Sequence, residues 1–180
     1  MRPDGTRVRD LTAIMQALPY VMPKRYDAQN WAEEYLDEDA IRDYIRAKRR
    51  EGRTVTHMSL LVSAYYRAVL KNPKINYFVM NRRIYKRNHF CFSFVILKTR
   101  ADGTPDETSL KVYLEPEDTV FTVTEKIRST IEKNQNIQHN NDTDRFAKFV
   151  FGVPGLARAV FGLAGFLDRH NLLPKSIIEL

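Results

Sequence analysis

The segment from Thr54 to Leu97 constrains the fold most, because its pattern is that of a helix, a turn and a strand in succession. Apolar residues at helical spacing predict one buried helix face, formed by Leu61, Ala64, Tyr65, Ala68 and Val69. Thr56 can cap the start of this helix, and Asn72-Pro73 ends it. The run His89–Leu97 hardly alternates, which is typical of a strand covered on both faces. The segment therefore predicts an α/β domain.

Helices outside this segment follow from capping residues and apolar periodicity. Asp37 can cap a helix over Glu38–Glu51, which Gly52 ends. A helix over about Asp118–Asn134 has capping-box spacing between Thr122 and Glu125 and an apolar stripe of Val120, Val123, Ile127 and Ile131. A short helix is expected at Leu11–Leu18, stopped by Pro19, and a polar loop at Asn134–Asp144. One or two short apolar helices are expected within Phe146–His170, interrupted by Gly152 and Pro154-Gly155.

The remaining strands are predicted from β-rich composition and alternation. Short strands are expected at Asn30–Leu36, Tyr77–Met80 and Arg83–Tyr85. Leu110, Val112 and Leu114 alternate with polar neighbours, which predicts a strand half exposed to water. Asp102-Gly103 is a strong turn signal, so this strand and the His89 strand are expected to form an antiparallel hairpin with a long loop.

Length and composition predict one domain over residues 1–180, since a chain of 180 residues can bury a sizeable core. A single cysteine excludes an internal disulfide framework and fits a reducing compartment. No signal peptide is recognised. The most apolar uncharged runs, Phe149–Ala157 and Ala159–Leu167, fall far short of the roughly 20 residues that span a bilayer. We therefore expect a cytoplasmic protein without a membrane partner.

The Thr54–Leu97 segment resembles the catalytic domain of the 2-oxo-acid dehydrogenase acyltransferase family and, more distantly, chloramphenicol acetyltransferase. The family pattern is a Leu-Leu helix with an Ala-x-x-x-Ala face, followed by Pro-x-hydrophobic-Asn leading into the sheet. The matching residues here are Leu60, Leu61, Ala64, Ala68, Pro73 and Asn76, with Ile84 in the next apolar position. All of them are packing and turn residues, so the resemblance concerns the fold more than the activity.

The resemblance implies a chloramphenicol acetyltransferase-like two-layer sandwich with a mixed, largely antiparallel sheet. It also implies a homotrimer with active sites between subunits, and acyl transfer between the coenzyme A thiol and a lipoyl or small-molecule acceptor, without a metal. The apolar ending Ser176–Leu180 leads us to expect a truncated domain that lacks the C-terminal strands.

The resembled family uses the histidine of a His-x-x-x-Asp-Gly motif as general base, a role that suits the pKa of imidazole. None of the four histidines, at positions 57, 89, 139 and 170, starts such a motif. We interpret His89 as a strand-end residue and His139 as a solvated loop residue, and His57 stays open. No residue is therefore assigned as catalytic, and the cofactor-binding residues stay undetermined.

Other reactive side chains have plainer interpretations. Cys91 lies inside an apolar strand without a basic neighbour, which is typical of an inert thiol. The acidic residues Glu33, Glu34, Asp37, Glu38 and Asp39 fit a strand edge and a helix N-terminus better than a metal site. The rings of Phe90, Phe92 and Phe94 are expected to fill the core, with a substrate channel as the weaker alternative.

The net charge of +7 invites a search for polyanion binding. The basic residues form two groups, one comprising Arg46, Lys48, Arg49, Arg50 and Arg53, the other Arg82, Arg83, Lys86 and Arg87. Each group is either a solvated surface or a site for a phosphate-bearing cofactor such as coenzyme A or for nucleic acid. Three functions stay open: a coenzyme A-dependent acyltransferase-like domain, a non-catalytic oligomerisation or partner-binding module of the same fold, and, ranked last, a nucleic-acid binder.

Overall fold

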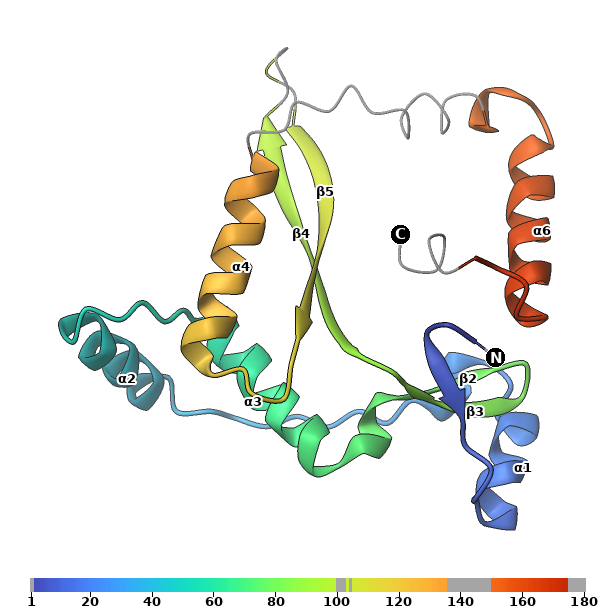
Figure 1. Ribbon diagram of the computed structural model, residues 1–180, viewed down its shortest axis with the longest axis horizontal. Helices are drawn as coiled ribbons and strands as arrows, with labels where there is room; N and C mark the ends of the chain where they lie inside the picture. The colour runs from blue at the N-terminus through green and yellow to red at the C-terminus, as the bar shows by residue number, and fades with distance from the viewer. Residues whose placement is uncertain (1, 100–102, 104, 136–149, 175–180) are drawn as a thin grey trace.

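The computed structural model describes residues 2–99, 103, 105–135 and 150–174, and it combines helices with two small antiparallel sheets (Figure 1). One sheet has the order β1-β3-β2, with β1 at Gly5–Arg7, β2 at Tyr77–Met80 and β3 at Arg83–Arg87. The other is a hairpin of β4, Phe90–Thr99, and β5, Pro105–Leu114. The α/β prediction is confirmed, but every strand pair within the described residues is antiparallel, so the mixed sheet is absent there.

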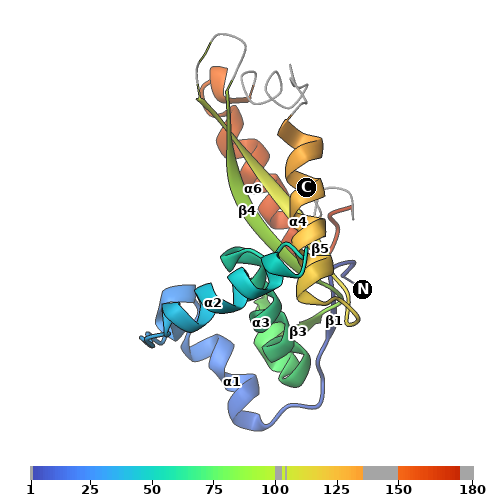
Figure 2. The same ribbon diagram turned by 90° about the vertical axis from the view of Figure 1, so that its left-hand side faces the viewer.

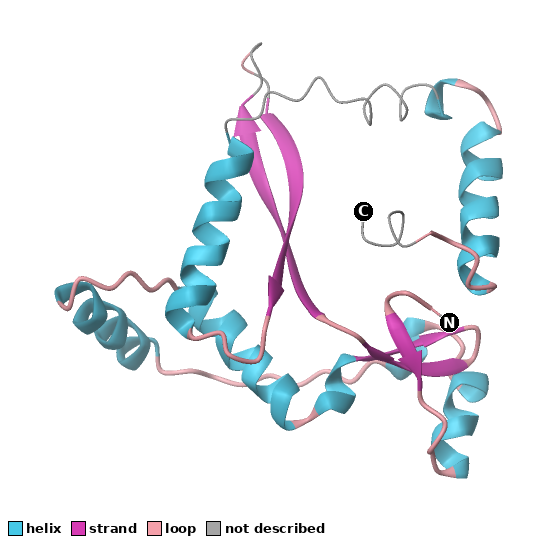
Figure 3. Cartoon of the chain, viewed as in Figure 1, coloured by secondary structure: helices cyan, strands magenta, loops and turns pink. Residues whose placement is uncertain are grey.

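The helices lie at both ends of an extended arrangement (Figure 3). Their bounds are α1 Ala13–Val21, α2 Glu38–Arg50, α3 His57–Lys71, α4 Val120–Gln135 and α6 Leu156–Arg169, with short 3₁₀ turns η1 Arg25–Ala28 and η2 Pro73–Asn76. Helix α4 runs along the β4–β5 hairpin and α3 lies across its base, whereas α1 and α6 lie at the end of the three-stranded sheet (Figure 1). No described helix has the length and apolar character needed to cross a bilayer.

The main core lies between the β4–β5 hairpin and the two helices α3 and α4 (Figure 2). It comprises Val62, Tyr66, Val69, Val112, Leu114, Val123 and Ile127. The register pairs Phe92 with Val112 and Phe90 with Leu114, which places alternate residues of both strands on the helix side. The predicted stripe of α4 is confirmed, since Val123 is fully buried and Ile127 nearly so.

The predicted buried face of α3 is wrong except at Val69, which is buried. Leu61 and Tyr65 are 58% and 54% exposed, and the buried face consists of Ser59, Val62, Ser63, Tyr66 and Val69. Serine is tolerated in this face because the Ser59 hydroxyl lies 2.8 Å from that of Thr124 on α4 and also bonds the Thr56 carbonyl. The small side chain lets the two helices approach closely, and the larger apolar residues stay outside.

The prediction that the His89 strand is covered on both faces is also wrong. Its inner residues pack on the helices, but Val95 and Leu97 on the outer face are exposed, because no described element covers that face. The predicted strand Asn30–Leu36 is wrong as well. This segment is irregular and pairs with no described strand, and Trp31 is 90% exposed.

Local signals located most element boundaries correctly. Asp37 caps α2 and Thr56 caps α3 as predicted, and Gly52 follows α2 with a φ of 76°. The prediction that Pro19 stops the first helix is wrong, because α1 continues to Val21 and Pro19 is buried within it. The cap of α4 lies one turn earlier than predicted, since Thr119 and Thr122 exchange hydrogen bonds there.

The interruption by Gly152 and Pro154-Gly155 is confirmed, because α6 begins only after Gly155. The predicted loop beyond residue 135, His139 and the ending Ser176–Leu180 lie outside the described residues.

Candidate functional site

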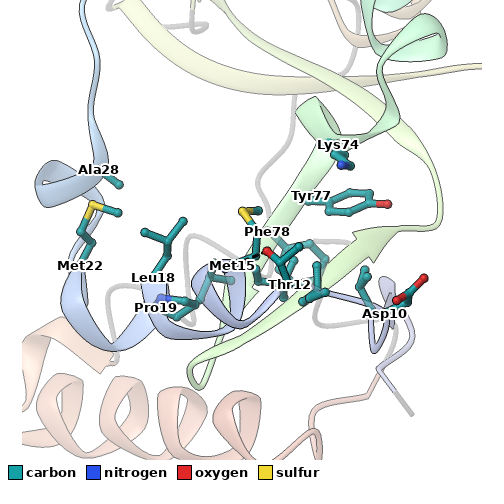
Figure 4. Close-up of a pocket in the computed structure, with 14 residues that line it drawn as sticks. Asp10, Thr12, Met15, Leu18, Pro19, Met22, Ala28, Lys74, Tyr77 and Phe78 are labelled. Carbon is teal, nitrogen blue, oxygen red and sulfur yellow. Dashed lines mark hydrogen bonds between the residues drawn. The ribbon is translucent and has the colours of Figure 1, made fainter.

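An apolar cavity of about 380 Å³ lies between α1 and the three-stranded sheet (Figure 4). Helix α1 contributes Met15, Leu18 and Pro19 to it, and β2 contributes Tyr77 and Phe78 from the opposite side. Asp10, Thr12 and Lys74 add one carboxylate, one hydroxyl and one ammonium group to the lining. A mostly apolar lining with few polar groups is the usual composition of a small-molecule pocket.

The chain around β1 builds this cavity through backbone pairing. Strand β1 pairs with β3, and the N–H of Val8 donates to the Ile84 carbonyl at 3.0 Å, which extends the pairing past the end of β1. Thr12 then caps α1 by accepting from the N–H of Met15. Gly5 is needed because a Cβ there would lie 2.7 Å from the Phe78 ring, so its absence lets that ring pack under β1.

A second cavity of about 690 Å³ adjoins the first and is lined by four arginines, Arg7, Arg9, Arg82 and Arg83. We call it the arginine cleft. Val8, Leu11, Pro19 and Ile84 line both cavities, so they form a shared wall. Among the residues that the structure describes, none of the four guanidinium groups lies within salt-bridge distance of a carboxylate. Their charges are therefore not neutralised by the described protein.

The turn between β2 and β3 positions Arg82. Asn81 and Arg82 both have positive φ angles, 48° and 58°, as the central residues of a type I′ hairpin turn do. The Arg82 guanidinium lies 5.2 Å from the centre of the Tyr20 ring on α1, within the range of a cation–π contact. This contact links the turn to α1 across the cleft.

A buried ionic cluster holds the sheet against the end of α6. Arg2 donates to both Asp4 oxygens, at 2.8 and 3.1 Å, and lies 2.8 Å from an Asp168 carboxylate oxygen. Its guanidinium also lies over the rings of Phe78 and Tyr85, and the residue is only 5% exposed. Burial alone would raise the pKa of Asp4, but the hydrogen bonds and charge of Arg2 outweigh it and hold that pKa below its ordinary value. Every charge here is paired, so the cluster is structural.

The described histidines lie away from both cavities. His57 is exposed at the start of α3, and His170 follows α6 with its ring 4.4 Å from that of Phe166. His89 precedes β4, where its ring meets Tyr113 edge-on and its carbonyl accepts a bond from Asn76. The described lining of the two cavities thus includes no imidazole that could act as a base.

The other sequence candidates are placed apart from the cavities. Burial raises the pKa of the partly buried Cys91 thiol, which lowers its thiolate fraction. Asp37 caps α2 and Asp39 pairs with Arg42, and no described group of His, Cys, Asp and Glu could hold a metal ion. The rings of Phe90, Phe92 and Phe94 pack against the core, as the sequence predicted.

The two predicted basic groups separate in the structure. Within the first, Lys48 pairs with Glu51, and Arg53 lies over the Phe121 ring at 4.7 Å. Within the second, Arg82 and Arg83 line the arginine cleft, whereas Lys86 and Arg87 do not. Arg7 and Arg9 were not predicted as site residues. The available signal was the alternation of arginine with Val8 just before a helix.

Comparisons with protein-family models, with curated proteins and with solved structures find no match to this chain.

Proposed function

We propose that this chain is a coenzyme A-dependent acyltransferase-like domain whose apolar cavity holds the acyl or pantetheine arm of the ligand. The cavity between α1 and β2 carries the proposal, because its volume of about 380 Å³ and its apolar lining suit a thin aliphatic chain. Methionine side chains such as Met15 and Met22 adapt readily to ligands of different shape. The transfer proposed is that of an acyl group between the coenzyme A thiol and a lipoyl or small-molecule acceptor.

The packing around the hairpin supports the fold that this function requires. Helices α3 and α4 cover one face of an antiparallel hairpin, which is the layering of a chloramphenicol acetyltransferase-like two-layer sandwich. The Asn76 side chain donates to the His89 carbonyl at 3.0 Å and so ties the turn after α3 to the start of β4. This bond gives the Pro-x-hydrophobic-Asn pattern of the resembled family a physical reason.

The described lining of the two cavities supplies binding surfaces for the reaction but no imidazole. Acyl transfer from coenzyme A requires removal of a proton from the attacking thiol or hydroxyl. The titratable side chains that line the cavity are Asp10, Lys74 and Tyr77. The contribution of the described residues is therefore to bind the ligand's arm.

Calorimetry with acetyl-coenzyme A tests the proposal. Wild-type protein should bind at millimolar ligand or below, and Leu18→Trp, which fills the cavity, should weaken binding at least tenfold. Ile14→Trp is the matched control, because Ile14 lies on the exposed side of α1 and should leave binding unchanged. Absence of binding heat at millimolar ligand would contradict the proposal.

One observation favours a second candidate, a non-catalytic oligomerisation or partner-binding module. Leu61 and Tyr65, which are 58% and 54% exposed, form an apolar face of α3 that no described element covers. Such a face would suit the trimer that the resemblance implies. Sedimentation should then show an oligomer that Leu61→Asp dissociates, and acyl transfer above background would contradict a non-catalytic role.

A further inference from the structure

We infer that the arginine cleft is a phosphate-binding site which, together with the apolar cavity, forms one bipartite site for a nucleoside diphosphate that carries an apolar arm. The inference rests on the proposed function for the arm, whereas the cleft's affinity for phosphate can be tested by itself. Charge, backbone conformation and the shared wall support it separately.

Four like charges line the arginine cleft, and no described carboxylate lies within salt-bridge distance of them. Arg7 pairs with Tyr85 in the register of β1 and β3, and the Val8–Ile84 hydrogen bond continues that register toward Arg9 and Arg83. Four guanidinium groups that line one cleft repel one another. A bound anion would remove this repulsion, and arginine's planar fork of donors matches phosphate oxygens.

Arg82 has an unusual backbone conformation, with a φ of 58°. The central positions of a type I′ turn favour glycine, asparagine and aspartate, and a long cationic residue with a positive φ is uncommon. Both residues are exposed, and the contact with Tyr20 holds this guanidinium beside the cleft. The cation is thus pre-organised between the sheet and α1 before any ligand binds, which lowers the entropy cost of binding.

The arginine cleft is continuous with the apolar cavity. Val8, Leu11, Pro19 and Ile84 line both cavities, so a ligand with phosphates in the cleft has an apolar surface directly beside them. A cleft of about 690 Å³ has room for a nucleoside diphosphate. A nucleic acid would instead call for an open basic stripe, and the basic residues of α2 lie on a different element.

Titration calorimetry of the full chain with three probes tests the inference. Pyrophosphate reports on the cleft alone, pantetheine on the cavity alone, and coenzyme A on both. The variant Arg82→Asn/Arg83→Gln removes two cations, and asparagine tolerates the positive φ of the turn. The variant Arg49→Gln/Arg50→Gln is the control, because it removes the same charge from α2, away from the cleft.

Wild-type protein should bind pyrophosphate and coenzyme A, with affinities that fall as salt rises from 50 to 200 mM. We expect the cleft variant to lose pyrophosphate binding, to bind coenzyme A at least tenfold more weakly and to bind pantetheine unchanged. The α2 control should change coenzyme A affinity less than twofold. Circular dichroism should show that both variants keep the wild-type fold; if the cleft variant is unfolded, Arg9→Gln, which changes no turn residue, takes its place.

Three outcomes would overturn the inference. They are pyrophosphate that does not bind wild-type protein at millimolar concentration, a cleft variant and a control that lose coenzyme A affinity equally, and a single-stranded oligonucleotide that displaces coenzyme A at a lower concentration than pyrophosphate does. If pyrophosphate binds through the cleft but pantetheine does not bind, the phosphate site stands and the proposed function fails.

Discussion

The two ends of this molecule are held together by different chemistry. Around the β4–β5 hairpin, aliphatic and aromatic side chains form the main core, in which Val123 has no exposed surface. At the end of α1, α6 and the three-stranded sheet, a charged residue occupies the central place, since Arg2 joins two carboxylates and two aromatic rings. Both described cavities that we assign to ligand lie at this second end.

A third cavity of about 380 Å³ lies beside Arg53, Phe121 and Arg128 at the hairpin end, but the two adjoining cavities lie at the charged end. Apolar side chains that interdigitate leave few voids larger than a water molecule. At the other end, Arg2 joins β1 and α6 through ion pairs instead of an apolar core, and the two cavities lie on the α1 side of the same sheet. The charged end therefore combines structural order with accessible volume, which a binding site needs.

The strongest test of this contrast is Arg2→Met. Removing the cation leaves Asp4 buried without its partner, and we expect a loss of about 3–5 kcal/mol in the free energy of unfolding. Urea denaturation measures this loss, and hydrogen exchange should show α6 opening first. Arg42→Met is the control, because its ion pairs on α2 are exposed and worth well under about 1 kcal/mol. Equal losses in the free energy of unfolding from the two substitutions would show that the ionic cluster does not stabilise the fold.

The packed end is tested by Ile127→Ala, which leaves a cavity between α4 and the hairpin. We expect a destabilisation of about 2–5 kcal/mol in urea denaturation, as for other buried aliphatic truncations. Ile14→Ala makes the same chemical change at a largely exposed position of α1 and should cost less than about 1 kcal/mol. A similar cost at both positions would mean that the hairpin core is not the main apolar core.

Acid should affect the charged end through Asp4. The folded-state pKa of this carboxyl lies below its ordinary value of 3.8, so the unfolded chain binds the proton more readily. Its contribution is fully present above about pH 5 and is lost as the pH falls through 3.8 toward the folded-state pKa. We expect the difference in stability between wild type and Asp4→Asn, measured by urea denaturation from pH 6 to pH 3, to shrink with acidity. A difference independent of pH would contradict the ionic account.

The smallest expected effect is the loss of a helix cap, which we compare between the two ends of the molecule. Thr56 caps α3, with its hydroxyl 3.1 Å from the Ser59 backbone nitrogen, and takes part in a capping box. The Thr12 hydroxyl lies 3.4 Å from the Met15 backbone nitrogen on α1. We expect Thr56→Ala to cost about 1 kcal/mol and Thr12→Ala about 0.5 kcal/mol in thermal unfolding. A larger cost at Thr12 would indicate that α1 is more tightly held than its open cavity suggests.

Features encoded by neighbouring residues could be predicted from the sequence. The cap at Asp37, the stripe through Val123 and Ile127, and the antiparallel hairpin all follow from short-range spacing, and the structure has them. The face of α3 could not be predicted, because a periodicity of apolar residues treats Ser59 as polar. Its burial depends on a hydroxyl of Thr124, 65 residues away.

The candidate site was harder to predict because it also depends on contacts between residues that are distant in sequence. Arg82 and Arg83 were identified as a basic group, but Arg7 and Arg9 join them only through the pairing of β1 with β3. Single-sequence patterns carry no signal for such a pairing between distant strands. The failed strand Asn30–Leu36 is the converse case, since its composition favours a strand but no described strand lies beside it to pair with.

The Arg2–Asp168 contact also sets an order of events during synthesis. Its two partners are 166 residues apart, so a ribosome that has released the first strand must translate almost all of α6 before the contact can form. The hairpin with α3 and α4 has its residues much closer in sequence and can assemble earlier. Strand β1 can pair with β3 once residue 87 is available, whereas Arg2 gains the Asp168 carboxylate only after α6 has been made.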